Sequence, residues 1–158
     1  VLNAVCDARA AYTEETGPTR LIFGLDANAY IEGIPGKKLG AREFAAACEA
    51  RGLGECWKGF AAAEPEKCCT TFNARTYLQP QLNKAVSHRQ ARNDKNTDRN
   101  PKDYVVFDKT QLEAKGAQPV RNNTGMRDKF DADAPFPTLH FPSDHAALLA
   151  ELVPLQDA

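Results

Sequence analysis

The order of the elements that the sequence predicts indicates an α/β fold, with helices packed on a mixed or antiparallel sheet. A helix over residues 2–15 is followed by a strand over 20–25, and a second helix over 41–51 precedes several further strands. The chain has 158 residues, 42% hydrophobic and 26% charged, which is enough for one domain with a buried core. We therefore treat residues 1–158 as a single domain.

The two predicted helices have apolar residues at helical spacing, and each ends at a glycine. The first helix carries Leu2, Val5 and Cys6 on one side and ends before Gly17. The second places its apolar residues on one stripe before its terminal glycine: Phe44, Ala47, Cys48 and Gly52.

The predicted strands are short apolar runs. The run at 20–25 is continuous, which is typical of a strand covered on both faces. Further strands are expected over 68–72, 103–107, 118–122 and 145–153. A polar segment over residues 77–101 without periodicity predicts a long loop.

Overall charge and the cysteines exclude some classes of function. The net charge is −1, so no overall basic field indicates a nucleic-acid partner, although residues 84–109 hold seven basic and four acidic side chains. No apolar run is long enough for a transmembrane segment. The five cysteines include no C-x-x-C pair, so a zinc site is not expected; a disulfide between Cys56 and Cys68 or Cys69 stays open.

Three polar groups follow or begin predicted strands. Asp26 and Asn28 come after the first strand, and their i, i+2 spacing places both side chains on one face of an extended chain. A carboxylate there can activate water and an amide can stabilise a phosphoryl oxygen, but a simple Asx turn explains the same pair.

The second and third groups are Asp103, at the start of a strand, and Asp144-His145, before an apolar run. A carboxylate can orient the histidine, as in other acid–histidine dyads, while a structural interpretation makes Asp144 a capping residue. The sequence lacks the glycine-flanked serine of α/β-hydrolases and the phosphate-binding loop of nucleotide hydrolases.

Four segments, 21–28, 70–75, 102–107 and 143–145, occur in the order found in the endonuclease/exonuclease/phosphatase superfamily, which the chain resembles. The resemblance implies a four-layer αββα sandwich and Mg²⁺-dependent hydrolysis of phosphoester bonds, with Mn²⁺ as an alternative cation. The family includes nucleases, inositol-polyphosphate phosphatases and sphingomyelinases.

Carried over onto this sequence, the resemblance implies four catalytic residues. Asp26 would activate water or protonate the leaving group, Asn28 would stabilise the transition state, and Asp103 would orient the catalytic His145. Asp144 would be a carboxylate of the metal site. The substrate-binding residues it implies are Asn73 and Arg75.

The resemblance covers only the second half of the family's pattern. No segment before Leu21 is similar to the first half, which supplies the glutamate of the main metal site. We therefore expect residues 1–158 to be a partial domain, a fragment, a cleaved form or one subunit, whose missing first half lies in the same chain or in another. The alternative function is a non-catalytic half-domain that binds or supports a larger assembly. The phosphoester substrate stays open among RNA, DNA, phosphoinositides, sphingolipids and nucleotides.

Overall fold

The computed structural model describes residues 1–73, 98–127 and 129–155, which form an α/β arrangement of helices and short antiparallel ladders. The helices are α1 (Leu2–Thr16), α2 (Ala41–Glu49), α3 (Phe60–Ala63) and the 3₁₀ helix η1 (Pro65–Cys68). The strands are β1 (Ile22–Asp26), β2 (Leu53–Glu55), β3 (Thr71–Asn73), β4 (Asp98–Asn100), β5 (Asp103–Asp108), β6 (Leu112–Ala114), β7 (Val120–Asn122), β8 (Ala147–Leu149) and β9 (Leu152–Pro154).

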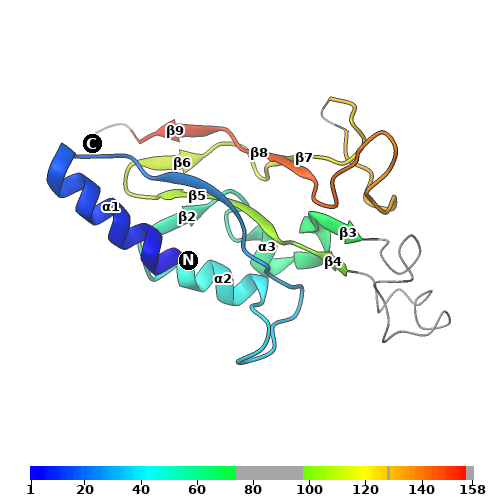
Figure 1. Cartoon of the computed structure of the whole chain (residues 1–158), viewed down its shortest axis with the longest axis horizontal. Coiled ribbons are helices and arrows are strands. Elements are labelled where there is room, and N and C mark those ends of the chain that lie inside the picture. Colours follow the sequence, from blue (N-terminus) through cyan, green and yellow to red (C-terminus); the bar gives the residue numbers. More distant parts are fainter. Residues whose placement is uncertain (74–97, 128, 156–158) are drawn as a thin grey trace.

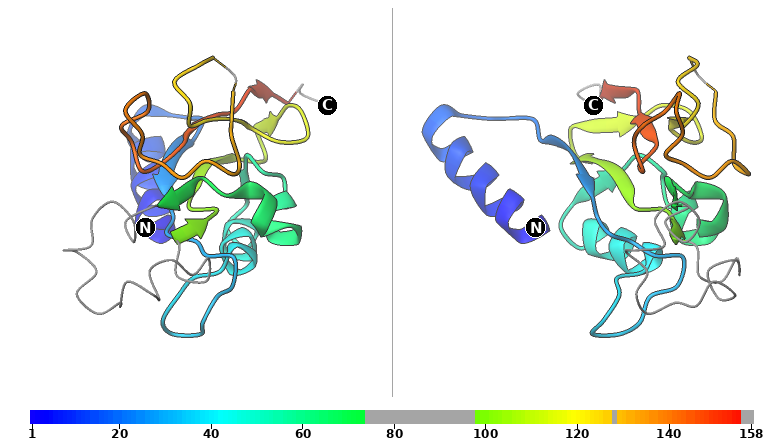
Figure 2. Two further views of the ribbon diagram at one scale, coloured as in Figure 1. Left: turned by 90° about the vertical axis from the view of Figure 1, so that its right-hand side faces the viewer. Right: turned by 45° about the vertical axis from the view of Figure 1, so that its right-hand side comes forward.

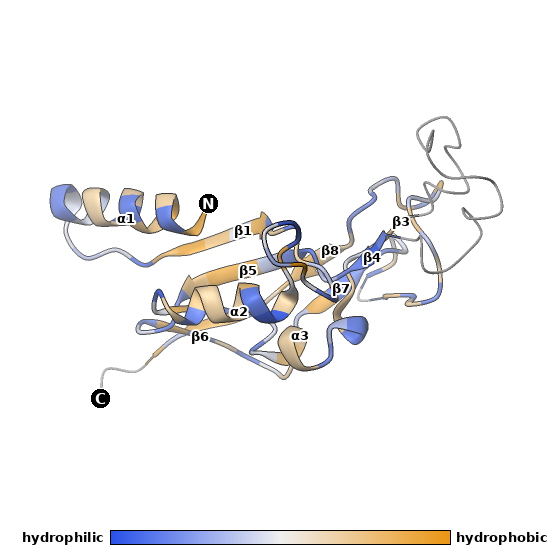
Figure 3. Cartoon of the chain, turned by 90° about the horizontal axis from the view of Figure 1, so that it is seen from below, coloured by the Kyte–Doolittle hydropathy of each residue, from blue (hydrophilic) through white to orange (hydrophobic). Residues whose placement is uncertain are grey.

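Strand β5 is the centre of the main sheet. It pairs antiparallel with β1 on one edge and with β2 on the other. Tyr104 and Val106 of β5 are 2% and 0% exposed, because alternate residues of a central strand face the core. Helices α2 and α3 lie on one side of this sheet, and the ladders β6–β9 and β7–β8 lie on the other (Figures 1 and 3).

The core is built from aromatic side chains of three segments. Trp57, from the turn after β2, is fully buried, and Phe44 of α2 packs on Tyr104 with ring centroids 4.4 Å apart. Helix α2 turns Ala41, Phe44 and Cys48 toward this core at helical spacing, as the sequence predicts. This packing supports the main sheet, whose strands β1 and β5 carry Asp26 and Asp103.

Several segments differ from the prediction. Residues 98–100, at the end of the predicted 77–101 loop, form strand β4, and residues 112–114, to which the sequence assigns no element, form β6. Residues 53–55, to which the sequence assigns no element, form the edge strand β2. Residues 68–72, predicted as one strand, include the end of η1 and the start of β3. Residues 145–153 divide into β8 and β9, because the chain changes its pairing partner from β7 to β6.

Helix α1 is attached to the domain through Leu2 and Cys6, which pack against the core, and through polar side chains. It has no buried residue, and Figure 2 shows it standing away from the sheet at the end of a long connection. The guanidinium of Arg9 pairs with Asp108, and Arg51 Nε donates to Asn3 Oδ1 over 2.7 Å. In the described part of the chain, no helix combines the length and apolarity needed to cross a bilayer.

Candidate functional site

The antiparallel register of β1 and β5 brings two predicted site residues together. Asp26 ends β1, Asp103 begins β5, and the two are direct partners in the ladder. Directly opposed like charges destabilise a strand pair, so two carboxylates at one rung favour a cation or a proton donor between them. Their position at the end of the ladder leaves them next to solvent.

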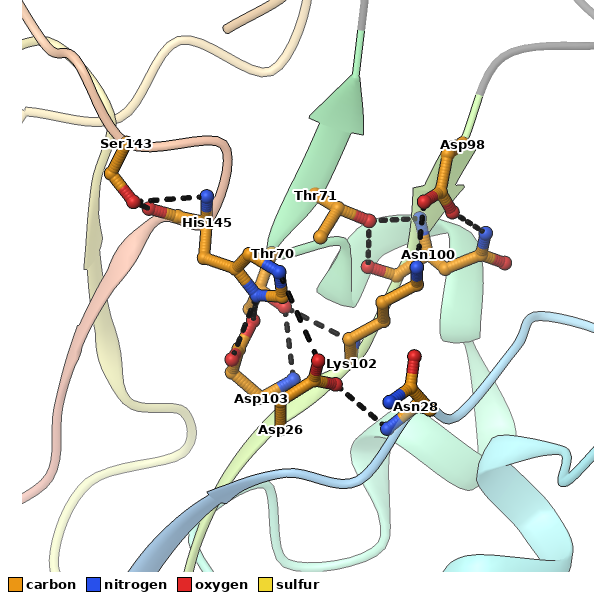
Figure 4. A network of polar contacts seen from close by, with 10 residues as sticks. All are labelled: Asp26, Asn28, Thr70, Thr71, Asp98, Asn100, Lys102, Asp103, Ser143 and His145. Carbon is orange, nitrogen blue, oxygen red and sulfur yellow. Dashed lines mark hydrogen bonds and ion pairs between the residues drawn. The ribbon is translucent and has the colours of Figure 1, made fainter. Parts of the chain in front are cut away.

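The ring of His145 lies between the two carboxylates. Its Nδ1 lies 3.0 Å from Asp103 Oδ2 and 3.1 Å from Oδ1, while its Nε2 lies 3.9 Å from Asp26 Oδ2. Figure 4 shows the ring between the two carboxylates. The side chains of Asp103, His145 and Asp26 are 18%, 31% and 38% exposed, so the cluster opens to solvent on the Asp26 side.

The backbone around His145 is fixed by two sets of hydrogen bonds. Ser143 Oγ accepts from the N–H of His145 over 3.1 Å and donates to its carbonyl over 2.8 Å. The N–H of the buried Ala146 donates to the Thr70 carbonyl over 2.8 Å. These contacts tie the segment before β8 to the segment before β3, and so place the imidazole over the β1–β5 edge.

Thr70 supports Asp103 from beneath. Its hydroxyl, fully buried, accepts from the backbone N–H groups of Lys102 and Asp103, each over 3.0 Å. The indole Nε1 of Trp57 donates to the Asp103 carbonyl over 3.2 Å. Sequence reasoning gave neither residue a role at this site, because a threonine before a strand and a tryptophan in a connector are ordinary.

Asn28 lies beside Asp26 in an Asx turn. Its N–H donates to Asp26 Oδ1 over 2.8 Å, and its φ of 49° is in the left-handed region that asparagine tolerates better than most residues. The structural interpretation of the pair is therefore present in the molecule. The turn leaves Asp26 Oδ2 directed toward His145, as Figure 4 shows.

A lysine lies next to the cluster. Lys102 is 7% exposed, its Nζ donates to Asp98 Oδ2 over 2.6 Å, and it lies 5.4 Å from the ring centroid of Tyr30. Asn100 Nδ2 donates to the other oxygen of Asp98 over 2.7 Å. The Lys102 side chain is thus engaged with Asp98 and Tyr30, while its backbone N–H donates to the Thr70 hydroxyl beneath Asp103.

The remaining predicted residues are placed only in part. Asp144 is half-buried next to His145, but it does not belong to the cluster of Asp26, Asp103 and His145. Of Asn73 the backbone is described, paired with Asp98 in the β3–β4 ladder. Arg75 and most of the predicted 77–101 loop lie outside the described residues.

The cluster could hold a metal ion. One ligand atom each from Asp26, Asp103 and His145 lie within 4.8 Å of one another, and among the described residues this is the group with such an arrangement. Carboxylate oxygens are preferred ligands of Mg²⁺ and Mn²⁺, whereas an imidazole suits softer ions. The two carboxylates therefore fit a hard divalent cation, while the imidazole is already engaged with Asp103.

The cysteines do not contribute a nucleophile. All five thiols are free, so the disulfide considered from the sequence is not formed. Burial raises the pKa of Cys48, Cys56 and Cys68 to about 12 and that of Cys69 to about 11. Such thiols remain protonated at neutral pH and are poor nucleophiles.

A scan against protein-family models and searches among curated proteins and solved structures found no match to this chain. The superfamily resemblance therefore stays a prediction from the sequence motifs.

Proposed function

We propose that this chain carries the acid–histidine part of a Mg²⁺-dependent phosphohydrolase, a nuclease or phosphodiesterase that cleaves phosphoester bonds by attack of water. One observation carries the proposal. Asp103 holds one nitrogen of His145, and the other nitrogen is directed toward Asp26 at a solvent-accessible strand edge. A histidine oriented by one carboxylate and facing another is suited to proton transfer and to stabilising charge on a phosphoryl oxygen.

In this mechanism, His145 acts through Nε2. Both ring nitrogens of an imidazolium are donors, so Nδ1–H binds Asp103 while Nε2–H is free for a phosphoryl oxygen. Thr70 and Trp57 hold the Asp103 backbone through its N–H and carbonyl, which limits the movement of the carboxylate and of the ring it binds. Positioning of this kind lowers the cost of reaching the reactive geometry.

Asp26 is the proposed base for the attacking water. The Asx turn with Asn28 fixes Oδ1, and Oδ2 is left to accept a proton from water. The water oxygen forms the new bond to phosphorus and the water proton passes to Asp26. The ester P–O bond breaks with its electron pair on the leaving oxygen, which takes up a proton from solvent. The proposal gives the side-chain amide of Asn28 the role of donating to the phosphoryl group beside this carboxylate.

A divalent cation would be held on the Asp103 side of the cluster, with Asp144 as an added ligand from the neighbouring segment, so that Asp26 Oδ2 stays available as the base. A Mg²⁺ or Mn²⁺ ion there would polarise the phosphoryl oxygen and offset the negative charge of the phosphate. Because Asp103 also binds His145, the cation and the imidazole share one carboxylate.

The proposal also includes a further segment, in the same or another chain, that completes the sandwich and adds ligands for the cation. Exposed apolar side chains support it: Ile22 of β1, Val120 of β7 and Leu149 of β8 are 52%, 43% and 65% exposed. Apolar side chains exposed on strands are frequent where another element packs.

The test is hydrolysis of bis(p-nitrophenyl) phosphate by the natural protein with whatever co-purifies, in Mg²⁺ and after chelation. His145→Ala should reduce the rate by about two to four orders of magnitude, since it removes a proton-transfer group. His140→Ala is the matched control, because His140 is exposed and lies five residues earlier in the same region. Activity that survives in His145→Ala, or that is lost equally in both variants, would contradict the proposal.

A binding or structural module is the second candidate, and the Asx turn favours it. Asp26 Oδ1 is used for local structure, as in many turns without catalytic function. If wild-type protein binds a phosphodiester without hydrolysing it in Mg²⁺ or Mn²⁺, this second function is supported and the first is excluded.

A further inference from the structure

A pocket of about 240 Å³ lies beside the β3–β4 ladder, separate from the Asp26–Asp103–His145 cluster. Two arginines and two phenylalanines define it, and we name it the Arg99–Arg121 pocket: Phe72, Arg99, Arg121 and Phe130, with Cys69 at its wall. Its volume is below the range typical of sites for drug-sized molecules, so it suits a single small group.

Both guanidinium groups are held by aromatic rings. Arg121 lies 4.0 Å from the ring centroid of Phe130 and 5.5 Å from that of Trp57, and Arg99 lies 5.0 Å from that of Phe72. A cation over an aromatic ring is attracted by the π electrons without using a hydrogen-bond donor. The contacts with the rings therefore stabilise the two cations and use none of their N–H groups.

Each arginine donates to one backbone carbonyl within the described residues. Arg121 Nη1 donates to the Cys69 carbonyl over 2.8 Å, and Arg99 Nη2 donates to the Ala132 carbonyl over 2.9 Å. Arg99 also interacts with the Cys69 thiol. A guanidinium has five N–H donors, so these contacts use a minority of the donors of each arginine. In the part of the chain that the structure describes, neither arginine forms an ion pair with a carboxylate, although the exposed Glu66 also lines the pocket.

Two like charges in one small pocket are costly without an anion. Burial lowers the pKa of Arg121, and the positive charge of Arg99 lowers it further against the opposing influence of the Cys68 and Cys69 thiols. A partly desolvated cation is stable when an anion binds its remaining donors. An anion in the pocket would lie between side chains of two different ladders, β3–β4 and β7–β8.

We propose that the Arg99–Arg121 pocket binds a phosphate group through N–H donors of both arginines that the contacts among the described residues leave over. Guanidinium donors match the geometry of phosphate oxygens in bidentate pairs, and the aromatic walls exclude water from the contact. The inference concerns binding and stands without the proposed hydrolysis.

The pocket is connected to the candidate active site through two contacts. The Cys69 carbonyl that binds Arg121 precedes Thr70, whose hydroxyl accepts from the Asp103 N–H. Trp57, which lies under Arg121, donates to the Asp103 carbonyl. The phosphate group in the pocket has two alternative sources. It belongs either to a substrate whose other phosphate lies at the Asp26–Asp103–His145 cluster, or to a separate phosphorylated ligand.

The first experiment measures binding of inorganic phosphate to the whole chain by calorimetry, at constant ionic strength set with chloride. Arg99→Gln and Arg121→Gln should each weaken binding at least tenfold, while Arg20→Gln, which removes a charge from an exposed arginine, should leave it unchanged. Arg99→Gln is the decisive variant if Arg121→Gln unfolds, since Arg99 has fewer packing contacts; circular dichroism verifies folding. Absence of phosphate binding to the wild type, or equal affinity in Arg99→Gln, overturns the inference.

The second experiment identifies the source of the phosphate. Affinity is compared for a dinucleotide with one internal phosphate and for the same dinucleotide with an added 5′ phosphate, in Mg²⁺-free buffer so that neither is hydrolysed. If the added phosphate raises affinity in the wild type and not in Arg99→Gln, one ligand spans both sites. Equal affinities in both proteins assign the pocket to a separate phosphorylated ligand. Failure of the His145→Ala test would leave both binding measurements unaffected.

Discussion

Strand β5 begins and ends with an aspartate, and the two carboxylates have different partners. Asp108 is 3% exposed; its Oδ1 accepts from the N–H and the hydroxyl of Thr110 over 2.8 and 2.7 Å, and its Oδ2 pairs with Arg9. Asp103, at the other end, binds the imidazole of His145. The two aspartates of β5 therefore have different environments.

The two carboxylates differ in whether their hydrogen-bond partner keeps a second group available for proton transfer. The donors around Asp108 are a backbone amide, a hydroxyl and a guanidinium, which stay protonated in the normal pH range and complete a structural contact. His145, in contrast, has a second nitrogen that is directed toward Asp26 and solvent. A buried carboxylate with permanent donors stabilises the fold, whereas one that holds a titratable ring at the surface can support chemistry.

The largest expected effect is on activity at the Asp103 end. Asp103→Asn keeps the size of the side chain but can present an amide N–H to His145 Nδ1, which favours the wrong tautomer. We expect the hydrolysis rate to fall by about 10³–10⁴-fold with little change in thermal stability, as when an acid–histidine dyad loses its carboxylate. The measurement is kcat for bis(p-nitrophenyl) phosphate in Mg²⁺.

Asp108→Asn is the matched control for this measurement, because it makes the same chemical change in the same strand. Its kcat per folded molecule should equal that of the wild type. If the two variants lose activity equally, the distinction between the two ends of β5 is wrong.

The next effect concerns Thr70, which supports the Asp103 end. Thr70→Val keeps the shape but removes the acceptor of two backbone N–H groups, those of Lys102 and Asp103. Leaving buried donors unpaired costs about 1–3 kcal/mol each, so we expect a loss of about 2–4 kcal/mol in the free energy of unfolding. Urea denaturation measures it, and Thr70→Ser, which retains the hydroxyl, should lose less; equal losses would contradict this role.

The third effect is on stability at the Asp108 end. Asp108→Ala removes the acceptor of both Thr110 donors and of Arg9. We expect the free energy of unfolding to fall by about 1–3 kcal/mol, measured by urea denaturation, with kcat per folded molecule unchanged. A stability equal to that of the wild type would show that the contact holds α1 without stabilising the domain.

The sequence predicted the parts of the molecule that have long periodic or continuous apolar patterns. The helix at 41–49 and the strands at 22–26 and 103–108 were predicted near their observed positions. The strands 53–55 and 152–154 have three residues each, too few for a pattern, and their pairing with β5 and β6 depends on tertiary contacts.

For the candidate site, the sequence indicated which residues could form it, but not which neighbouring residues hold them in position. Asp26, Asp103 and His145 each lie beside an apolar run, and the resemblance grouped them at one site; the order of the strands that brings them together was not predicted. The hydroxyl of Thr70 was not predictable as a support, because its acceptor role depends on a segment 32 residues away. The roles of all the predicted site residues, and the cation itself, stay predictions.

The smallest effect is the dependence of stability on acid pH, and it isolates the Asp108 end. Burial alone would raise the pKa of Asp108, but hydrogen bonds from Thr110 and Arg9 and the charge of Arg9 together lower it below the ordinary value of 3.8. A carboxyl whose pKa is lower in the folded than in the unfolded protein stabilises the fold above pH 3.8, and this contribution is lost as pH falls through the folded pKa. The wild type should therefore lose stability between about pH 5 and pH 2 more steeply than Asp108→Asn, which cannot titrate there. Urea midpoints measured at intervals across this range provide the comparison, and Asp103→Asn, at the solvent-accessible end of the strand, is the reference substitution. Parallel curves for the wild type and Asp108→Asn would mean that the acid sensitivity of this fold comes from other carboxyl groups, and the structural role of the Asp108 end would then rest on the Asp108→Ala measurement alone.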